Sequence, residues 1–163
     1  MIPKILGRIF ARLWENPSIQ RWAMRRSYGH LYNKAGPYML RYTIVARGGW
    51  GSKVLKALSL GRYDHVRLHH IMQADFDREL HNHPFKYRTF ILDGWYNETR
   101  RNDRQRVLMV GDTATGAGYH RIAALPPDGV TTLFFMGKDS GEWGFLVDGK
   151  HVTSREFFKQ RNG

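Results

Sequence analysis

Residues 75–94 read DFDRELHNHPFKYRTFILDG, and this stretch carries the most informative pattern in the chain. His81 and His83 are two positions apart, so on an extended strand both imidazoles point to the same face. Two neutral imidazoles on one face can bind a single metal ion at about 2.0–2.1 Å. Pro84 lacks the N–H needed for strand pairing, which favours a place at the end of the strand. An isolated pair of this kind also occurs by chance on solvent-facing strands, so further residues must support the metal site.

Outward from this stretch, the sequence after Pro37 consists of short runs rich in β-branched and aromatic residues, separated by turn residues such as Asp93-Gly94 and Asp139-Ser-Gly141. About eight short strands at regular spacing are typical of a β-sandwich or a barrel-like jelly roll. Loops are expected at 48–51 and 59–64. The expected strands are 38–46, 65–73, 87–92, 95–99, 105–110, 119–125, 131–136 and 142–148.

The chain before this region has a different pattern. Apolar residues at helical spacing predict an amphipathic helix over 2–15, with a basic row formed by Lys4, Arg8 and Arg12. Asn16-Pro17 ends this helix, and Ser18 is expected to cap a second helix that runs to about Tyr32. We therefore expect a basic helical segment over 1–36 and a single β-domain over 37–163.

The charge is concentrated in the first part of the chain. The net charge is +12, and residues 1–67 contain 13 Lys and Arg against only Glu15 and Asp64. A basic amphipathic segment could contact nucleic acid or an anionic membrane surface, but we expect its apolar face to pack on the barrel or on a second subunit. The chain has no cysteine, which excludes disulfides and thiolate ligands and suits the cytoplasm. The charged start is not expected to act as a secretory signal.

The stretch from His81 to Gly94 resembles the first motif of the cupin superfamily, in which His-x-His is followed by a glutamate and then a glycine. Tyr87 and Arg88 occupy the positions where that glutamate is expected. The second cupin motif supplies a further histidine after a glycine turn, and His120, which follows Gly118, is similar to it. The resemblance implies one divalent metal ion held by His81, His83 and His120.

The chain more closely resembles a branch of small phage and bacterial cupin-like proteins with a Leu-His-x-His-Pro-aromatic motif. The resemblance implies a mainly β, cupin-type double-stranded β-helix (jelly roll) with one or two N-terminal α-helices, a homodimer, and the host cytoplasm as location if the protein is phage-encoded. The matching segments, in the same order, are Leu80–Phe85, Gly94–Glu98, His120-Arg121, Thr132-Leu133 and Glu142–Phe145.

Further residues are candidates for the site. Glu79 shares strand parity with the histidine pair, and Glu98 follows the Gly94 turn, so either carboxylate could be an additional metal ligand. For each of them, a surface charge or an ion pair is the simpler explanation. His70 has the parity of Leu68 and so is the better inward candidate of the His69-His70 pair, although a plain core or rim histidine is the simpler explanation. The candidates for lining the pocket or contacting substrate are His70, Tyr87, Arg88, Tyr96, Arg121 and Trp143.

These patterns predict a metal-binding protein whose reaction stays open. Imidazole ligands suit Fe, Zn, Ni or Cu, and three of them leave coordination positions open for substrate. A metal-dependent enzyme of oxygenase or isomerase type, acting on a small polar or anionic substrate, is one hypothesis. A non-catalytic module that binds or sequesters a sugar or nucleotide is the other hypothesis, because the cupin fold hosts many functions; the resemblance to phage proteins implies a phage-encoded module in that case.

Overall fold

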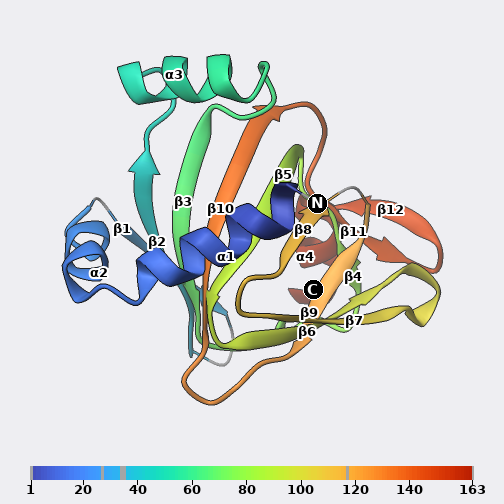
Figure 1. Ribbon diagram of the computed structural model, residues 1–163. Coiled ribbons are helices and arrows are strands. Elements are labelled where there is room, and N and C mark those ends of the chain that lie inside the picture. The colour runs from blue at the N-terminus through green and yellow to red at the C-terminus, as the bar shows by residue number, and fades with distance from the viewer. Residues whose placement is uncertain (1, 27, 34–35, 117, 163) are drawn as a thin grey trace.

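The computed structural model (Figure 1) describes residues 2–26, 28–33, 36–116 and 118–162, and it contains two six-stranded antiparallel sheets. The first sheet runs in the order β1 (Tyr28–Asn33), β2 (Gly36–Val45), β3 (His65–Ile71), β10 (Val130–Asp139), β5 (Phe85–Asp93) and β8 (Thr113–Gly116). The second runs in the order β12 (Lys150–Thr153), β11 (Gly144–Val147), β4 (Leu80–His81), β9 (His120–Ala124), β6 (Trp95–Arg100) and β7 (Gln105–Met109).

A hydrophobic core lies between the two sheets. Ile71 and Ile91 of the first sheet pack with Tyr96, Leu108 and Ile122 of the second, and all five are buried. Alternate residues of each strand supply this core because side chains along a strand point to opposite faces. The arrangement confirms the expected mainly β jelly roll.

Helix α1 (Ile2–Trp14) lies across the outer face of the first sheet (Figure 1). The Phe10 ring packs edge-on against Phe90 of β5 with the centroids 5.1 Å apart, and Trp14 is buried in the same outer layer. The helix approaches so closely that a Cβ atom on Gly7 would lie 2.2 Å from the carbonyl oxygen of Gly111. The first sheet therefore packs apolar side chains on both of its faces.

The opposite side of α1 faces solvent. Ile5, Ile9 and Leu13 are 50%, 48% and 49% exposed, on a helix that also carries Arg8 and Arg12. One part of its apolar surface thus packs on the barrel as expected, while another part is uncovered. Among the described residues, no helix combines the length and apolar character needed to cross a membrane.

The segment after α1 differs from the expectation. Asn16, not Ser18, caps α2 (Pro17–Met24), because the Asn16 side chain accepts a hydrogen bond of 2.9 Å from the Ser18 N–H. This helix ends at Met24 instead of about Tyr32, since residues 28–33 form β1 and pair with β2. Pairing with an available sheet edge outweighs local helix propensity here. The division at residue 36 stays a prediction.

Other elements escaped the sequence patterns. The expected loop after Gly48 contains α3 (Trp50–Leu58), and the chain ends in α4 (Ser154–Asn162). The short strands β8 and β12 were not expected either, because four residues are too few to show a clear alternation. A single 3-10 turn, η1 (Arg101–Asp103), connects β6 and β7.

Candidate metal site

Three histidines converge at one end of the barrel. His81 on β4 pairs with His120 on β9, and their ring centroids lie 4.7 Å apart. His83 follows β4, and its Nε2 atom lies 3.0 Å from Nε2 of His120. One ring nitrogen from each histidine lies within 4.8 Å of the others. Two nitrogens bound to one ion at about 2.1 Å are about 3 Å apart when the bonds are at right angles, and this is the separation of the His83 and His120 nitrogens. The three histidines together could hold a metal ion.

The His-x-His segment is held in place by its neighbours. Asn82, between the two histidines, points the other way, and its Oδ1 accepts a hydrogen bond of 2.8 Å from the Gly144 N–H. The Pro84 carbonyl accepts a hydrogen bond of 2.6 Å from the Ser140 N–H. Alternation therefore places the two imidazoles together although the regular strand is only two residues long.

Burial keeps the imidazoles of His81 and His83 in the neutral form that binds metal. It lowers the pKa of His81 to about 4; the charge of Asp75 partly offsets this, and His120 adds to it. Burial, with His120 and His81 as neighbours, lowers the pKa of His83 well below its ordinary value. Neutral imidazoles have a free ring nitrogen at neutral pH, and metal ligation requires that lone pair.

A buried carboxylate stands behind His120. Glu98 is 1% exposed, and its Oε1 atom lies 2.8 Å from Nδ1 of His120. Burial raises the pKa of Glu98, but the close contact with His120, followed by the hydrogen bond and charge of Arg106, lowers it to about 2 overall. The sequence-based hypothesis that Glu98 is a metal ligand is therefore not supported by its position. Its carboxylate instead orients His120 so that Nε2 faces the converging nitrogens.

Asp75 has a similar position behind His81. Its Oδ2 atom lies 3.6 Å from Nδ1 of His81 and accepts a hydrogen bond of 2.6 Å from the Ile122 N–H. The Tyr38 hydroxyl donates to Oδ1 of the same carboxylate. We did not expect a role for Asp75 from the sequence, because it lies in an irregular segment where spacing carries no signal about facing.

Tyr87 closes one side of the site. Its hydroxyl lies 3.2 Å from Nε2 of His120, and its ring stacks on Phe134 with the centroids 4.7 Å apart. A Cβ atom on Gly116 would lie 1.6 Å from the Tyr87 ring, so only glycine leaves room for this position. Tyr87, a pocket candidate from the sequence, is among the residues that line the pocket beside His83.

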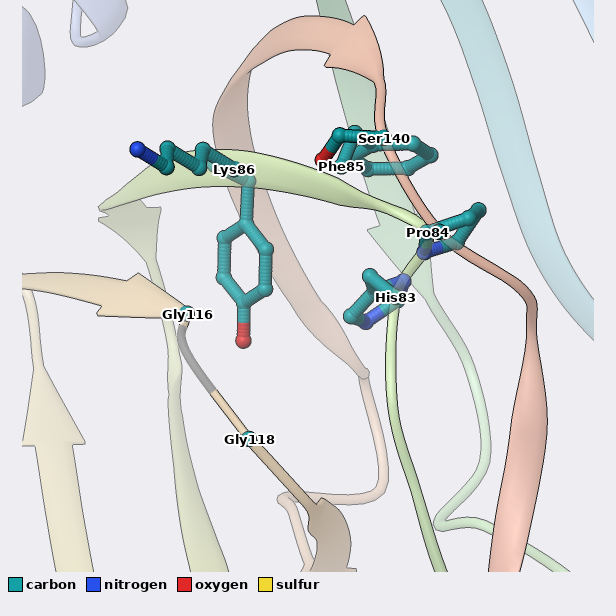
Figure 2. A pocket seen from close by; sticks show the side chains of 9 residues that line it. His83, Pro84, Phe85, Lys86, Gly116, Gly118 and Ser140 are labelled. Atoms are coloured by element: carbon teal, nitrogen blue, oxygen red, sulfur yellow. The ribbon is translucent and has the colours of Figure 1, made fainter. Parts of the chain in front are cut away.

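A pocket opens beside His83, and Figure 2 shows Gly116 and Gly118 opposite His83 across it. The pocket gives a small molecule access to the histidine group from one side, which fits open coordination positions. Its lining residues are His83, Pro84, Phe85, Lys86, Tyr87, Gly116, Gly118, Ser140 and Gly141.

Two other candidates lie away from the ligand atoms. Glu79 occupies a bend before β4, so strand parity does not apply to it, and it is not part of the histidine group. His70 is half-buried, and its Nδ1 atom lies 3.1 Å from Oγ1 of Thr131. The inward residue of its pair is His69, which stacks on Phe134. The prediction for His70 was wrong because Leu68, which shares its parity, packs against the outer helices.

The remaining pocket candidates are distributed around the barrel. Arg88 follows Tyr87 on the outward face of β5 and donates a 3.3 Å hydrogen bond to Thr113, so it does not replace an inward glutamate. Arg121 is on the opposite side of β9 from His120. Tyr96 lies in the central core. Trp143 packs on Phe158 of α4, with ring centroids 6.0 Å apart, and does not line the pocket.

Comparison with solved structures agrees with this architecture. No protein-family model matches the chain, and no curated protein does. The chain is similar to a cupin-2 domain protein from Rhodospirillum rubrum, with 13% identity, a TM-score of 0.51, and coverage of 84% of this chain and 82% of that one. It is also similar to a structure described as DMSP lyases RdDddP and RnDddQII, with 15% identity, a TM-score of 0.50, and coverage of 69% of this chain.

The chain spans 57% of the length of the lyase structure. A structure of iron(II) HppE matches at 11% identity and a TM-score of 0.49, over 69% of this chain and 57% of that one. Identities this low concern the fold alone. Two facing antiparallel sheets, with three histidines gathered at one end, give this chain the cupin fold.

Proposed function

We propose that this protein is a metal-dependent enzyme that holds one divalent ion through His81, His83 and His120 and acts on a small polar or anionic molecule. The observation that carries the proposal is the convergence of three imidazoles, with one ring nitrogen of each within 4.8 Å of the others, beside a pocket. A structural metal site is closed by protein ligands, whereas three ligands facing a pocket suit a catalytic ion.

When bound, the ion supplies a Lewis acid or, if it is redox-active, a centre for oxidative chemistry. The residues of the chain have separate roles around it. Glu98 and Asp75 hold the rings of His120 and His81 in the orientation that directs one nitrogen inward. The Tyr87 hydroxyl is placed to donate a hydrogen bond, or a proton, to a substrate oxygen held near these nitrogens.

Metal analysis of the purified full chain tests the proposal. We expect about one equivalent of Fe, Zn, Ni or Cu, and replacement of any of the three histidines by alanine should lower metal affinity at least tenfold. His70→Ala and His151→Ala are matched controls that should retain the metal, since His70 on β3 and His151 on β12 lie outside the histidine group. Stoichiometric metal that survives all three substitutions, or no metal at any supplied concentration, would contradict the proposal.

Turnover separates an enzyme from a binding module. In an enzyme, Tyr87→Phe should keep the metal, since the hydroxyl is not one of the three ligand nitrogens, while slowing the reaction. In a sequestering module, a sugar or nucleotide incubated with the metal-loaded protein would be recovered unchanged. That result, across the substrates that bind, would replace the enzymatic proposal with the binding one.

A second contact is favoured by the exposed face of α1. Ile5, Ile9 and Leu13 lie in solvent on a helix that also carries Arg8 and Arg12, as in helices that lie on anionic membrane surfaces. Nucleic acid would use the arginines but would gain little from exposed aliphatic side chains. We therefore propose an anionic lipid surface, in preference to nucleic acid, as the partner of this face.

A further inference from the structure

The inner face of the first sheet carries two arginines and a histidine in addition to the metal site. Arg41 on β2 pairs with His69 on β3, and Arg67 on β3 pairs with Phe134 on β10. Directly paired residues of an antiparallel sheet present their side chains on the same face. The Phe134 ring lies 5.9 Å from that of His83, so this face is continuous with the wall of the metal site.

Both arginines are half-buried without a counter-ion. Within the part of the chain that the structure describes, no hydrogen bond or ion pair joins either side chain to another residue. Burial lowers the pKa of Arg41, and the charge of Arg67 lowers it further. The carboxylate of Asp64, just before β3, is paired with Arg47 at 3.2 Å. Two neighbouring cations that are partly removed from water cost free energy unless an anion joins them.

His69 adds an unpartnered polar atom to this surface. It is 8% exposed, its ring stacks on Phe134, and its buried Nε2 atom has no hydrogen-bond partner among the described residues. A buried polar atom without a partner costs about 1–3 kcal/mol, so such atoms often mark a place where a ligand or a water binds. A neutral imidazole can donate one hydrogen bond to an anionic oxygen.

We propose that Arg41, Arg67 and His69 form an anion-binding subsite for a carboxylate or phosphate group of the substrate. The guanidinium groups would bind the anion through paired N–H donors, and His69 would donate a third hydrogen bond. This inference rests on the proposed function for its biological role and narrows the substrate to small organic acids or phosphate esters. Anion binding itself needs no metal, so the two ideas can be tested separately.

Calorimetric titration of the full chain with inorganic phosphate and with succinate tests the subsite. We expect one equivalent of at least one probe to bind, and the double variant Arg41→Gln/Arg67→Gln to bind it at least tenfold more weakly. The matched control Arg88→Gln/Arg121→Gln removes two charges from outward faces and should bind normally. Phosphate binding alone would assign a phosphate ester, and succinate binding alone would assign an organic acid.

Measuring metal content and anion binding on the same variants separates the anion subsite from the metal-dependent enzyme. His81→Ala/His83→Ala should still bind the anion, and Arg41→Gln/Arg67→Gln should retain wild-type metal content. The thermal midpoint of the arginine variant, measured without anion, should not fall, because unpaired charges have been removed. The subsite is overturned if neither probe binds the wild type, if the arginine variant binds equally well or unfolds, or if the control loses as much affinity. Anion binding by a protein that takes up no metal would support the subsite and contradict only the enzyme proposal.

Discussion

Replacing Glu98 by glutamine is the sharpest test of how the metal site is built. The change keeps the shape of the side chain and removes one negative charge at a position that is 1% exposed. It weakens the interaction that orients Nδ1 of His120, 2.8 Å away, and leaves Arg106 without its partner. Both the metal affinity and the stability of the metal-free protein should therefore fall.

The size of each effect follows from the surroundings of the carboxylate. Removing one partner of a buried pair costs about 3–5 kcal/mol, but Arg106 is 35% exposed and water offsets part of that cost. We expect the free energy of unfolding at pH 7 to fall by about 2–3 kcal/mol. Loss of a carboxylate behind a metal-bound histidine typically lowers metal affinity about 10–100-fold.

The pH dependence gives a second readout with a defined sign. The pKa of Glu98 is about 2 in the folded chain against an ordinary value of 4.5. Because folding favours the charged form, this contribution is complete above about pH 5 and is lost as the pH falls towards 2. By pH 3.5 the wild type should have lost about 1.4 kcal/mol more than Glu98→Gln, relative to their values at pH 6.

Urea unfolding of metal-free protein and competition with a chelator for the bound metal measure these quantities. Glu79→Gln is the matched control, since it makes the same chemical change at a half-buried position outside the histidine group, and it should leave both quantities nearly unchanged. The reasoning is refuted if Glu98→Gln retains wild-type metal affinity and unfolds within about 0.5 kcal/mol of the wild type.

Three further predictions concern other parts of the molecule. Gly116→Ala should displace the Tyr87 ring and lower the midpoint of thermal unfolding, since the new Cβ would lie 1.6 Å from that ring. An unchanged midpoint, together with an unmoved ring in a crystal structure of the variant, would disprove the packing argument. Burial lowers the pKa of His69 to about 3 in the folded chain, so between about pH 6.5 and pH 3 a proton binds this side chain in the unfolded chain only. The free energy of unfolding should therefore fall by up to about 1.4 kcal/mol per pH unit as the pH is lowered through this range. Urea unfolding of His69→Phe at several pH values should lack this share of the decline. Ile9→Glu/Leu13→Glu should abolish co-sedimentation of the protein with phosphatidylserine vesicles. The midpoint of thermal unfolding should not change, because both side chains are about half exposed. Retained vesicle binding would count against the proposal that α1 lies on an anionic membrane surface.

Local spacing in the sequence determined much of this protein. Alternation of apolar residues and the turns between them predicted most of the central strands, and the two-residue spacing placed His81 and His83 on one face. The resemblance to cupin motifs, more than the spacing, singled out His120. The start of the chain was less predictable, because whether residues 28–33 form helix or strand depends on the sheet edge available to them.

Only the tertiary structure decided which face of a strand is the inner one. Parity shows that Leu68 and His70 share a face, but α1 and α2 cover that face from outside and turn His69 inward instead. The positions of Asp75 and Glu98 also depend on the tertiary structure. Each carboxylate lies beside the Nδ1 atom of a histidine, on the opposite side of the ring from Nε2, and so stands behind the histidine and not among the metal ligands. Spacing along the chain fixes relative orientation, whereas burial depends on what packs against each side.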